Sequence, residues 1–224
     1  MKKIFTLKKQ RGFTMIELLI VITILGILAV AVLSAINPIE QINRGRDTSS
    51  QSDAEQLLSA IERYNAFQGH FPWQLDADET QTHVYDSSGY PVKVTALAPC
   101  SDNDAGQSRA DCSDTDCPIL DRLATGDETI TSCNGSQEIK ASFVTRLVDT
   151  DTRSLFVYHS GDTGASTYVC FIPQSGAFED DATERCEGTD GLPEDVTTDA
   201  EAFICEGTGR AVDDSPDTPM VCLP

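Results

Sequence analysis

No cysteine precedes Cys100 in this 224-residue chain, and no two cysteines form a Cys-x-x-Cys pair. Structural zinc sites usually contain such close pairs or Cys/His clusters, whereas His70, His83 and His159 are scattered. The chain also lacks a G-x-S-x-G nucleophile motif, a phosphate-binding glycine loop and a metal-binding histidine pair. We therefore predict no catalytic residues, no metal site and no cofactor, and hence a protein that is not an enzyme.

Positive charge is scarce beyond the first twelve residues. Five of the 16 basic residues precede Phe13, whereas all 36 acidic residues follow it. Removing residues 1–12 leaves 11 basic and 36 acidic residues, a net charge of −25. A surface this acidic repels phosphate backbones, so we expect no direct nucleic-acid binding. The length suits one modest globular domain with attached segments.

The eight cysteines lie in surroundings rich in Gly, Asp and Thr. Their even number, downstream of a segment typical of export, indicates disulfides formed in an oxidising compartment. Eight cysteines allow about 105 connectivities, so the pairing stays open. The disulfide candidates are Cys100, Cys112, Cys117, Cys133, Cys170, Cys186, Cys205 and Cys222.

A long apolar run occupies residues 13–36, with the sequence FTMIELLIVITILGILAVAVLSAI. As a helix, this run would be about 36 Å long, enough for the ~30 Å hydrocarbon core of a bilayer. The basic residues in front of it favour a cytoplasmic N-terminus. A secretory signal peptide is instead cut after its apolar region. The run therefore predicts a membrane-spanning helix.

Glu17 is the unusual residue in this run. Placing a charge inside a membrane helix costs at least ~2.5 kcal/mol even on insertion scales. An ordinary uncleaved membrane anchor would not need a carboxylate at this position. Glu17 therefore needs a partner inside the membrane. Ionisable residues in membrane helices usually mark functional sites, so we expect a functional role for Glu17.

The segment Lys9-Gln10-Arg11-Gly12-Phe13-Thr14-Met15-Ile16-Glu17-Leu18-Leu19 resembles the class III signal of type IV prepilins and type II secretion pseudopilins. The resemblance implies cleavage between Gly12 and Phe13 by prepilin peptidase, followed by N-methylation of Phe13. Gly12 suits this role because its backbone can approach the protease closely. The resemblance also implies that Glu17 meets the terminal amine of a neighbouring subunit and sets the register of assembly.

The function implied by this resemblance is that of a structural subunit of a type IV pilus. The partners would be identical subunits in a homopolymer, prepilin peptidase and the pilus assembly machinery. The chain would be a single-pass protein of the cytoplasmic (inner) membrane before assembly and part of a cell-surface filament afterwards. A type II secretion pseudopilin is an alternative in the same family. From another class, an uncleaved membrane-anchored binding protein with a disulfide-rich ectodomain is the alternative.

A second, amphipathic helical segment follows the apolar run. Apolar side chains recur at three- and four-residue steps at Ala54, Leu57, Leu58, Ile61 and Tyr64. Two features interrupt the segment: Pro38 is expected to kink the helix, and Ser52-x-x-Glu55 is a capping box expected to restart it. One continuous bent helix is the alternative.

Residues 68–140 are predicted as a loop region with one or two short strands, of which Val92–Leu97 is the best candidate. Three later segments, rich in β-branched or aromatic residues and separated by turns, are predicted as strands of an antiparallel meander. They are Ser142–Val148, Ser154–His159 and Thr167–Ile172. In the tail, Cys186-Glu-Gly-Thr is echoed by Cys205-Glu-Gly-Thr, which indicates either two similar disulfide-pinned loops or a coincidence. Acidic clusters at 102–116 and 213–217 lack the EF-hand order of a calcium loop, so solvated loops are favoured.

These observations predict an α+β fold similar to that of pilins. A long N-terminal helix, transmembrane in its first half and amphipathic in its second, would pack on a small antiparallel β-sheet. We expect a leader at 1–12, a transmembrane and filament-core helix at 13–36 and its amphipathic continuation at 37–68. The headgroup of variable loop and sheet would cover 69–173, and acidic cysteine-rich loops would cover 174–224.

Overall fold

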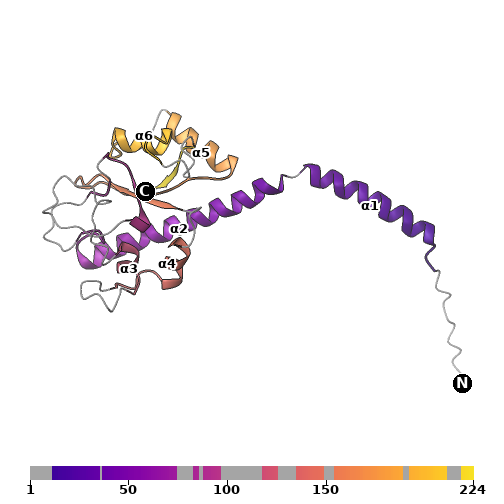
Figure 1. The fold of residues 1–224 in the computed structure, drawn as a ribbon, viewed down its shortest axis with the longest axis horizontal. Coiled ribbons are helices and arrows are strands. Elements are labelled where there is room, and N and C mark those ends of the chain that lie inside the picture. Colours follow the sequence, from indigo (N-terminus) through magenta and orange to yellow (C-terminus); the bar gives the residue numbers. More distant parts are fainter. Residues whose placement is uncertain are drawn as a thin grey trace, which may run out of the picture. The chain divides into compact units, whose positions relative to one another are not determined.

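The computed structural model describes residues 12–35, 37–74, 83–85, 88–96, 118–125, 135–148, 154–188, 192–210 and 218–224. The chain divides into two compact units, Met1–Gln41 and Ile42–Pro224. The first unit contains helix α1 (Met15–Ala35) and the first residues of α2, and the second contains the rest of α2, the sheet and the other helices (Figure 1).

Helix α2 (Pro38–Gln68) begins three positions after Ala35, the last residue of α1. Pro38 was predicted to kink one helix, but it occupies the first position of a new one, where its missing N–H is harmless. Asn37 caps this start, because its Oδ1 accepts a hydrogen bond from the Glu40 N–H at 3.5 Å. The long N-terminal helical region is thus assigned as two consecutive helices, α1 and α2.

The predicted restart at Ser52 is also wrong, since α2 runs unbroken through this polar stretch. The stretch stays helical because some of its polar groups are held by the fold: Asp47 is buried and accepts hydrogen bonds from the backbone of Gln174 and Ser175. The predicted amphipathic face is confirmed. All of its members are buried: Ala54, Leu57, Leu58, Ile61 and Tyr64.

The sheet has four antiparallel strands in the order β1-β2-β3-β4. Two of the predicted strands are confirmed as β2 (Leu155–His159) and β3 (Thr167–Phe171). The first predicted strand is much shorter than expected, because β1 (Val92–Lys93) gives way to a 3₁₀ turn, η1 (Val94–Ala96). The tail supplies an unpredicted edge strand, β4 (Val221–Leu223).

The predicted strand at Ser142–Val148 is wrong, because these residues belong to helix α4 (Ala141–Val148). Phe143 and Leu147 are four residues apart and are both buried, so the segment has one apolar helical face. The β-branched residues suggested a strand, but this helical spacing decides the structure. Helix α3 (Ile119–Leu123) packs beside α4.

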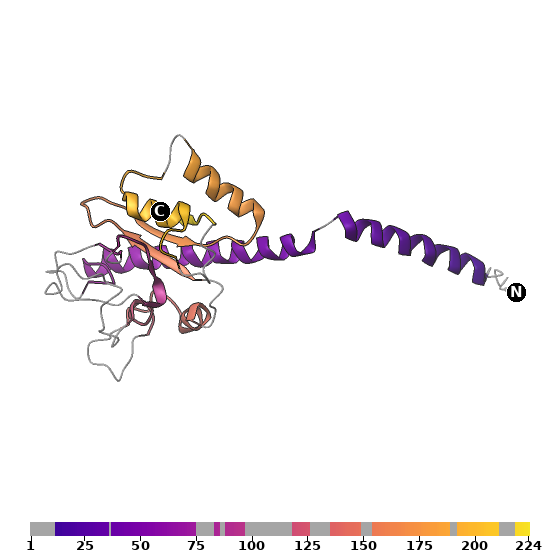
Figure 2. The same ribbon diagram turned by 45° about the horizontal axis from the view of Figure 1, so that its top comes forward.

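Both faces of the sheet are covered. Side chains of β2 alternate between two cores: Leu155 and Val157 pack with α2, α3 and α4, whereas Phe156 and Tyr158 pack with α6 (Thr198–Glu206). Figure 2 shows these helices on the two sides of the sheet. Every residue of β2 and β3 is consequently buried.

The tail, expected to form loops, contains two helices, α5 (Gly176–Glu187) and α6. Thr197 caps α6, because its side chain accepts a hydrogen bond from the Ala200 N–H at 3.4 Å. Gly207 ends the helix with φ of 70°, a left-handed conformation that favours glycine. Helix α5 packs against β4 and α6.

Candidate processing and assembly site

The predicted cleavage point lies just outside the first helix. Gly12, Phe13 and Thr14 have no regular structure, and α1 begins at Met15. The Phe13 side chain is 78% exposed. The Gly12–Phe13 peptide bond therefore lies outside the helix, next to an exposed side chain.

Thr14 and Glu17 form a reciprocal capping box at this helix start. Glu17 Oε2 accepts hydrogen bonds from the Thr14 N–H at 3.0 Å and from Thr14 Oγ1 at 2.8 Å. In return, Thr14 Oγ1 accepts from the Glu17 N–H at 3.3 Å. This arrangement satisfies two donors that a helix start otherwise leaves without partners. The role of Thr14 was not predicted, although its three-residue spacing from Glu17 is the signature of a capping box.

The remaining polar side chains of α1 are satisfied within the helix. Thr23 Oγ1 donates to the Ile20 carbonyl at 2.8 Å, and Ser34 Oγ donates to the Ala31 carbonyl at 2.9 Å. Such bonds allow hydroxyl groups to enter an apolar medium. Glu17 is thus the only charged group in α1.

Among the described residues, Met15–Ser34 is the one helix long and apolar enough to cross a membrane. None of its side chains is buried in the chain itself. Around Gly26 the surface has an apolar depression lined by Ile22, Thr23, Ile27 and Val30. A helix of this kind requires lipid or other protein around it.

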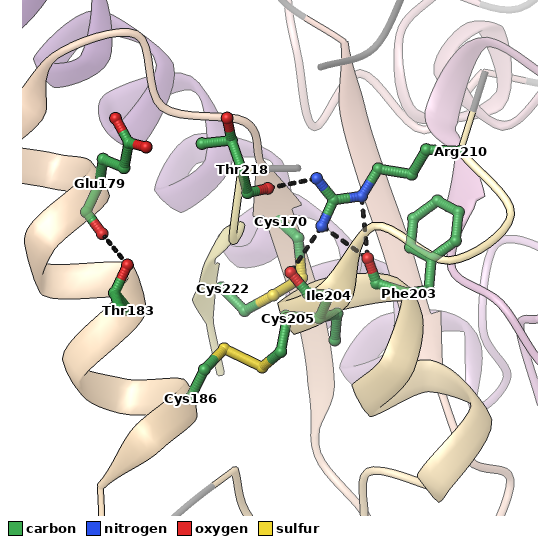
Figure 3. Close-up of a disulfide and its surroundings, with 10 residues drawn as sticks. All are labelled: Cys170, Glu179, Thr183, Cys186, Phe203, Ile204, Cys205, Arg210, Thr218 and Cys222. Carbon is green, nitrogen blue, oxygen red and sulfur yellow. Dashed lines mark hydrogen bonds between the residues drawn. A yellow bond between two sulfur atoms is a disulfide. The ribbon is translucent and has the colours of Figure 1, made fainter. Parts of the chain in front are cut away.

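Four of the cysteine candidates form two disulfides, Cys170–Cys222 and Cys186–Cys205 (Figure 3). The first joins register partners on β3 and β4, with Cα atoms 4.0 Å apart. The second joins the two Cys-Glu-Gly echoes, which prove to be the ends of α5 and α6 rather than two separate loops. The other candidates, Cys100, Cys112, Cys117 and Cys133, lie outside the described residues.

A polar cluster ties the start of α6 to the sheet. The Asp195 carboxylate accepts hydrogen bonds from Tyr168 Oη at 2.6 Å and from the Ser166 N–H at 2.8 Å. Burial, this hydrogen bond and the charge of Asp195 raise the pKa of Tyr168 to about 12. Burial alone would raise the pKa of Asp195, but the hydrogen bonds from Tyr168 and Ser166 outweigh it and lower that pKa. The cluster is a structural anchor, because each polar group is paired.

Metal binding finds no support in the part of the chain that the structure describes, where no group of three or more His, Cys, Asp or Glu is placed to hold an ion. The two acidic clusters considered for calcium, at 102–116 and 213–217, lie outside that part.

The N-terminal segment matches a known family. Residues 7–33 match the prokaryotic N-terminal methylation motif, which is the class III prepilin signal of type IV pilins and pseudopilins. Comparison with curated proteins found no match, and comparison with solved structures found none. The motif and the apolar helix together suggest membrane anchoring, and a motif of the pilin type indicates a structural protein rather than an enzyme. More particularly, the motif supports a protein similar to type IV pilins or pseudopilins.

Proposed function

We propose that this chain is the precursor of a type IV pilus subunit. It is inserted in the cytoplasmic membrane with its N-terminus inside, cut between Gly12 and Phe13 by prepilin peptidase, and N-methylated at Phe13. The pilus assembly machinery then joins identical subunits into a surface filament through α1. The observation that carries the proposal is the position of the methylation motif, which overlaps the start of an apolar helix that the rest of its own chain does not cover.

Glu17 provides the specific contact in this proposal. Thr14 occupies Glu17 Oε2 through two hydrogen bonds. A carboxylate has room for further donors on its second oxygen, so the amine created at Phe13 of a neighbouring subunit can bind without displacing Thr14. Such an ion pair would set axial register more than it would add adhesion, because desolvation offsets much of its attraction.

The test of processing is to shear filaments from cells that express the chain and to determine their N-terminus by mass spectrometry. We expect a subunit that begins with methylated Phe13. A mature chain that begins at Met1 would leave the uncleaved membrane-anchored binding protein as the better explanation. A processed chain that never appears in long surface filaments, but supports secretion of other proteins, would identify a type II secretion pseudopilin.

The test of register is Glu17→Ala. We expect this variant to be inserted in the membrane but not to polymerise, because the partner amine is left uncompensated at a cost of about 3–5 kcal/mol. Glu55→Ala is the matched control, since Glu55 is an exposed carboxylate on α2, and it should form filaments normally. Normal filaments from Glu17→Ala would contradict the register role.

A further inference from the structure

The Cys186–Cys205 disulfide lines an open groove on the headgroup. The groove lies between α5 and α6 and encloses about 500 Å³. Besides the two cysteines, its lining contains Thr183, Glu187, Thr198, Glu201, Ala202, Glu206 and Pro219. Figure 3 shows this disulfide between the two helices, with the second disulfide beside it. A groove of this size has room for a small molecule to reach the sulfur atoms.

The two disulfides differ in accessibility. Cys186 and Cys205 are both half-exposed. Cys170 is fully buried and Cys222 is 8% exposed, and both lie in the core beneath α6. Thiol–disulfide exchange requires access of a thiolate to a sulfur atom. Between these two disulfides, Cys186–Cys205 is therefore the one open to exchange.

The charged residues that line the groove are all acidic. Glu187 and Glu206 each follow one of the cysteines directly, and Glu201 lines the same groove. Both cysteines also lie in the last turn of their helices, where the helix dipole adds negative potential. The nearby Arg185 does not line the groove: it pairs with Asp181 at 3.1 Å and donates to the Cys222 carbonyl at 3.5 Å.

We propose that Cys186–Cys205 is a thiol-exchange site that selects cationic thiols over anionic ones. The attacking species in exchange is a thiolate, so the carboxylates of the groove repel it. A thiol that carries an ammonium group offsets this repulsion, whereas one that carries a sulfonate or carboxylate adds to it. The inference concerns the headgroup alone and does not depend on whether the chain forms filaments.

The exchange proceeds in two steps. A thiolate attacks one cysteine sulfur, a mixed disulfide forms, the protein S–S bond breaks, and the other cysteine leaves as a thiolate that takes a proton from water. A second thiolate then attacks the small-molecule sulfur of the mixed disulfide and releases the first cysteine, which is also protonated. Two thiols are oxidised to one disulfide, and their two electrons reduce Cys186–Cys205.

The experiment compares cysteamine and 2-mercaptoethanesulfonate, two small thiols of similar size and opposite charge. The full chain is kept in a nonionic detergent at low ionic strength, and alkylation followed by peptide mapping measures opening at each cysteine. Rates are expressed per thiolate and relative to the same thiols acting on an uncharged small disulfide. We expect cysteamine to open Cys186–Cys205 at least about tenfold faster, and the ratio to fall toward one at high salt.

The carboxylates are tested with Glu187→Gln/Glu206→Gln. We expect this variant to reduce the cysteamine preference several-fold without changing the fold. The matched control is Glu55→Gln/Glu62→Gln, which removes the same charge from the exposed side of α2 and should keep the preference.

Three results would overturn the proposal. The first is equal rates for the two thiols at low salt. The second is opening of Cys170–Cys222 before Cys186–Cys205. The third is an equal loss of preference in the α2 control, which would assign the selectivity to the net charge of the chain instead of to the groove.

Discussion

Asp47 connects helix α2 to the start of α5 through side-chain hydrogen bonds. Its carboxylate is buried and accepts hydrogen bonds from the Gln174 N–H, the Ser175 N–H at 2.8 Å and Ser175 Oγ at 2.6 Å. Ser175 is the N-cap of α5 but makes no side-chain cap bond of its own. Asp47 therefore supplies, from another helix, the negative charge that a helix start favours.

We expect Asp47→Ala to lower the free energy of unfolding by about 2–4 kcal/mol, because it leaves buried donors without an acceptor. Urea unfolding followed by the fluorescence of Trp73 measures this, since Trp73 is the single tryptophan and is fully buried. Ser52→Ala, at an exposed position on the same helix, should change stability little. An equal effect of both variants would show that Asp47 has no special role.

His159 is a buried histidine in the aromatic core of the headgroup. Its ring lies 4.8 Å from Phe71 and 5.9 Å from Trp73 between centroids, and its Nδ1 accepts the Gly161 N–H at 2.9 Å. Burial lowers the pKa of His159, although the nearby charge of Asp195 opposes this shift. The folded state therefore binds the proton less readily than the unfolded chain does.

The stability contributed by neutral His159 is complete above the unfolded pKa of about 6.5 and is lost as the pH falls from there toward the lower folded pKa. We expect the free energy of unfolding to decrease in this window, by at most about 1.4 kcal/mol per pH unit from this one group. His159→Asn retains an acceptor for Gly161 and should flatten the pH dependence. Unchanged pH dependence in this variant would assign the effect to other groups.

At the scale of elements, the sequence predicts the long helical segments and the central strands well. The membrane helix and the buried face of α2 follow from unbroken apolar composition and from periodicity. Helix α4 was missed because Phe143 and Leu147, which reveal its buried face, lie among β-branched residues. Helices α5 and α6 were missed because they lie in a tail rich in Gly, Asp and Thr and contain several acidic residues, which favoured a prediction of loops.

For the candidate site too, some features could be predicted from the sequence and others could not. The resemblance to prepilins predicts roles for Gly12, Phe13 and Glu17, whereas the hydrogen bonds of Thr14 required coordinates. Disulfide pairing could not be predicted, because it depends on which strands and helices lie side by side. The pairing of Cys170 with Cys222, for example, follows from the register of β3 and β4.

The Cys170–Cys222 bridge closes a loop with a sequence separation of 52. Chain-entropy arguments give a stabilisation of about 4 kcal/mol for a loop of this length. We expect Cys170→Ala/Cys222→Ala to lower the free energy of unfolding by roughly that amount. Cys186→Ala/Cys205→Ala, which opens a loop with a separation of 19, should have a smaller effect. Urea unfolding of both variants measures the difference, and the reverse order would contradict the assignment of the core bridge.

At the scale of the whole molecule, the headgroup has two cores divided by one sheet. Strands covered on one face alternate apolar and polar residues, whereas β2 and β3 consist largely of apolar and aromatic residues, in the runs LFVYH and TYVCF. This composition explains why these two strands could be located from sequence. Helix α6, which covers the second face of the sheet, could not be predicted from the sequences of these two strands.

The acidic surface has a consequence for stability. Without residues 1–12 the chain carries a net charge of −25, and such self-repulsion disfavours the compact state. We expect the free energy of unfolding to rise as added salt shortens the Debye length from about 30 Å at 0.01 M to about 3 Å at 1 M. Urea unfolding at several NaCl concentrations measures this, and a flat dependence would show that the charges are too far apart to matter.

The two bridges are nested, since Cys186 and Cys205 lie between Cys170 and Cys222 in the chain. A protease that cuts once between Cys186 and Cys205 leaves both new ends covalently attached, and a cut elsewhere inside the outer ring does the same. Such a nicked subunit keeps its full mass until it is reduced. A single cut in this region therefore releases no fragment.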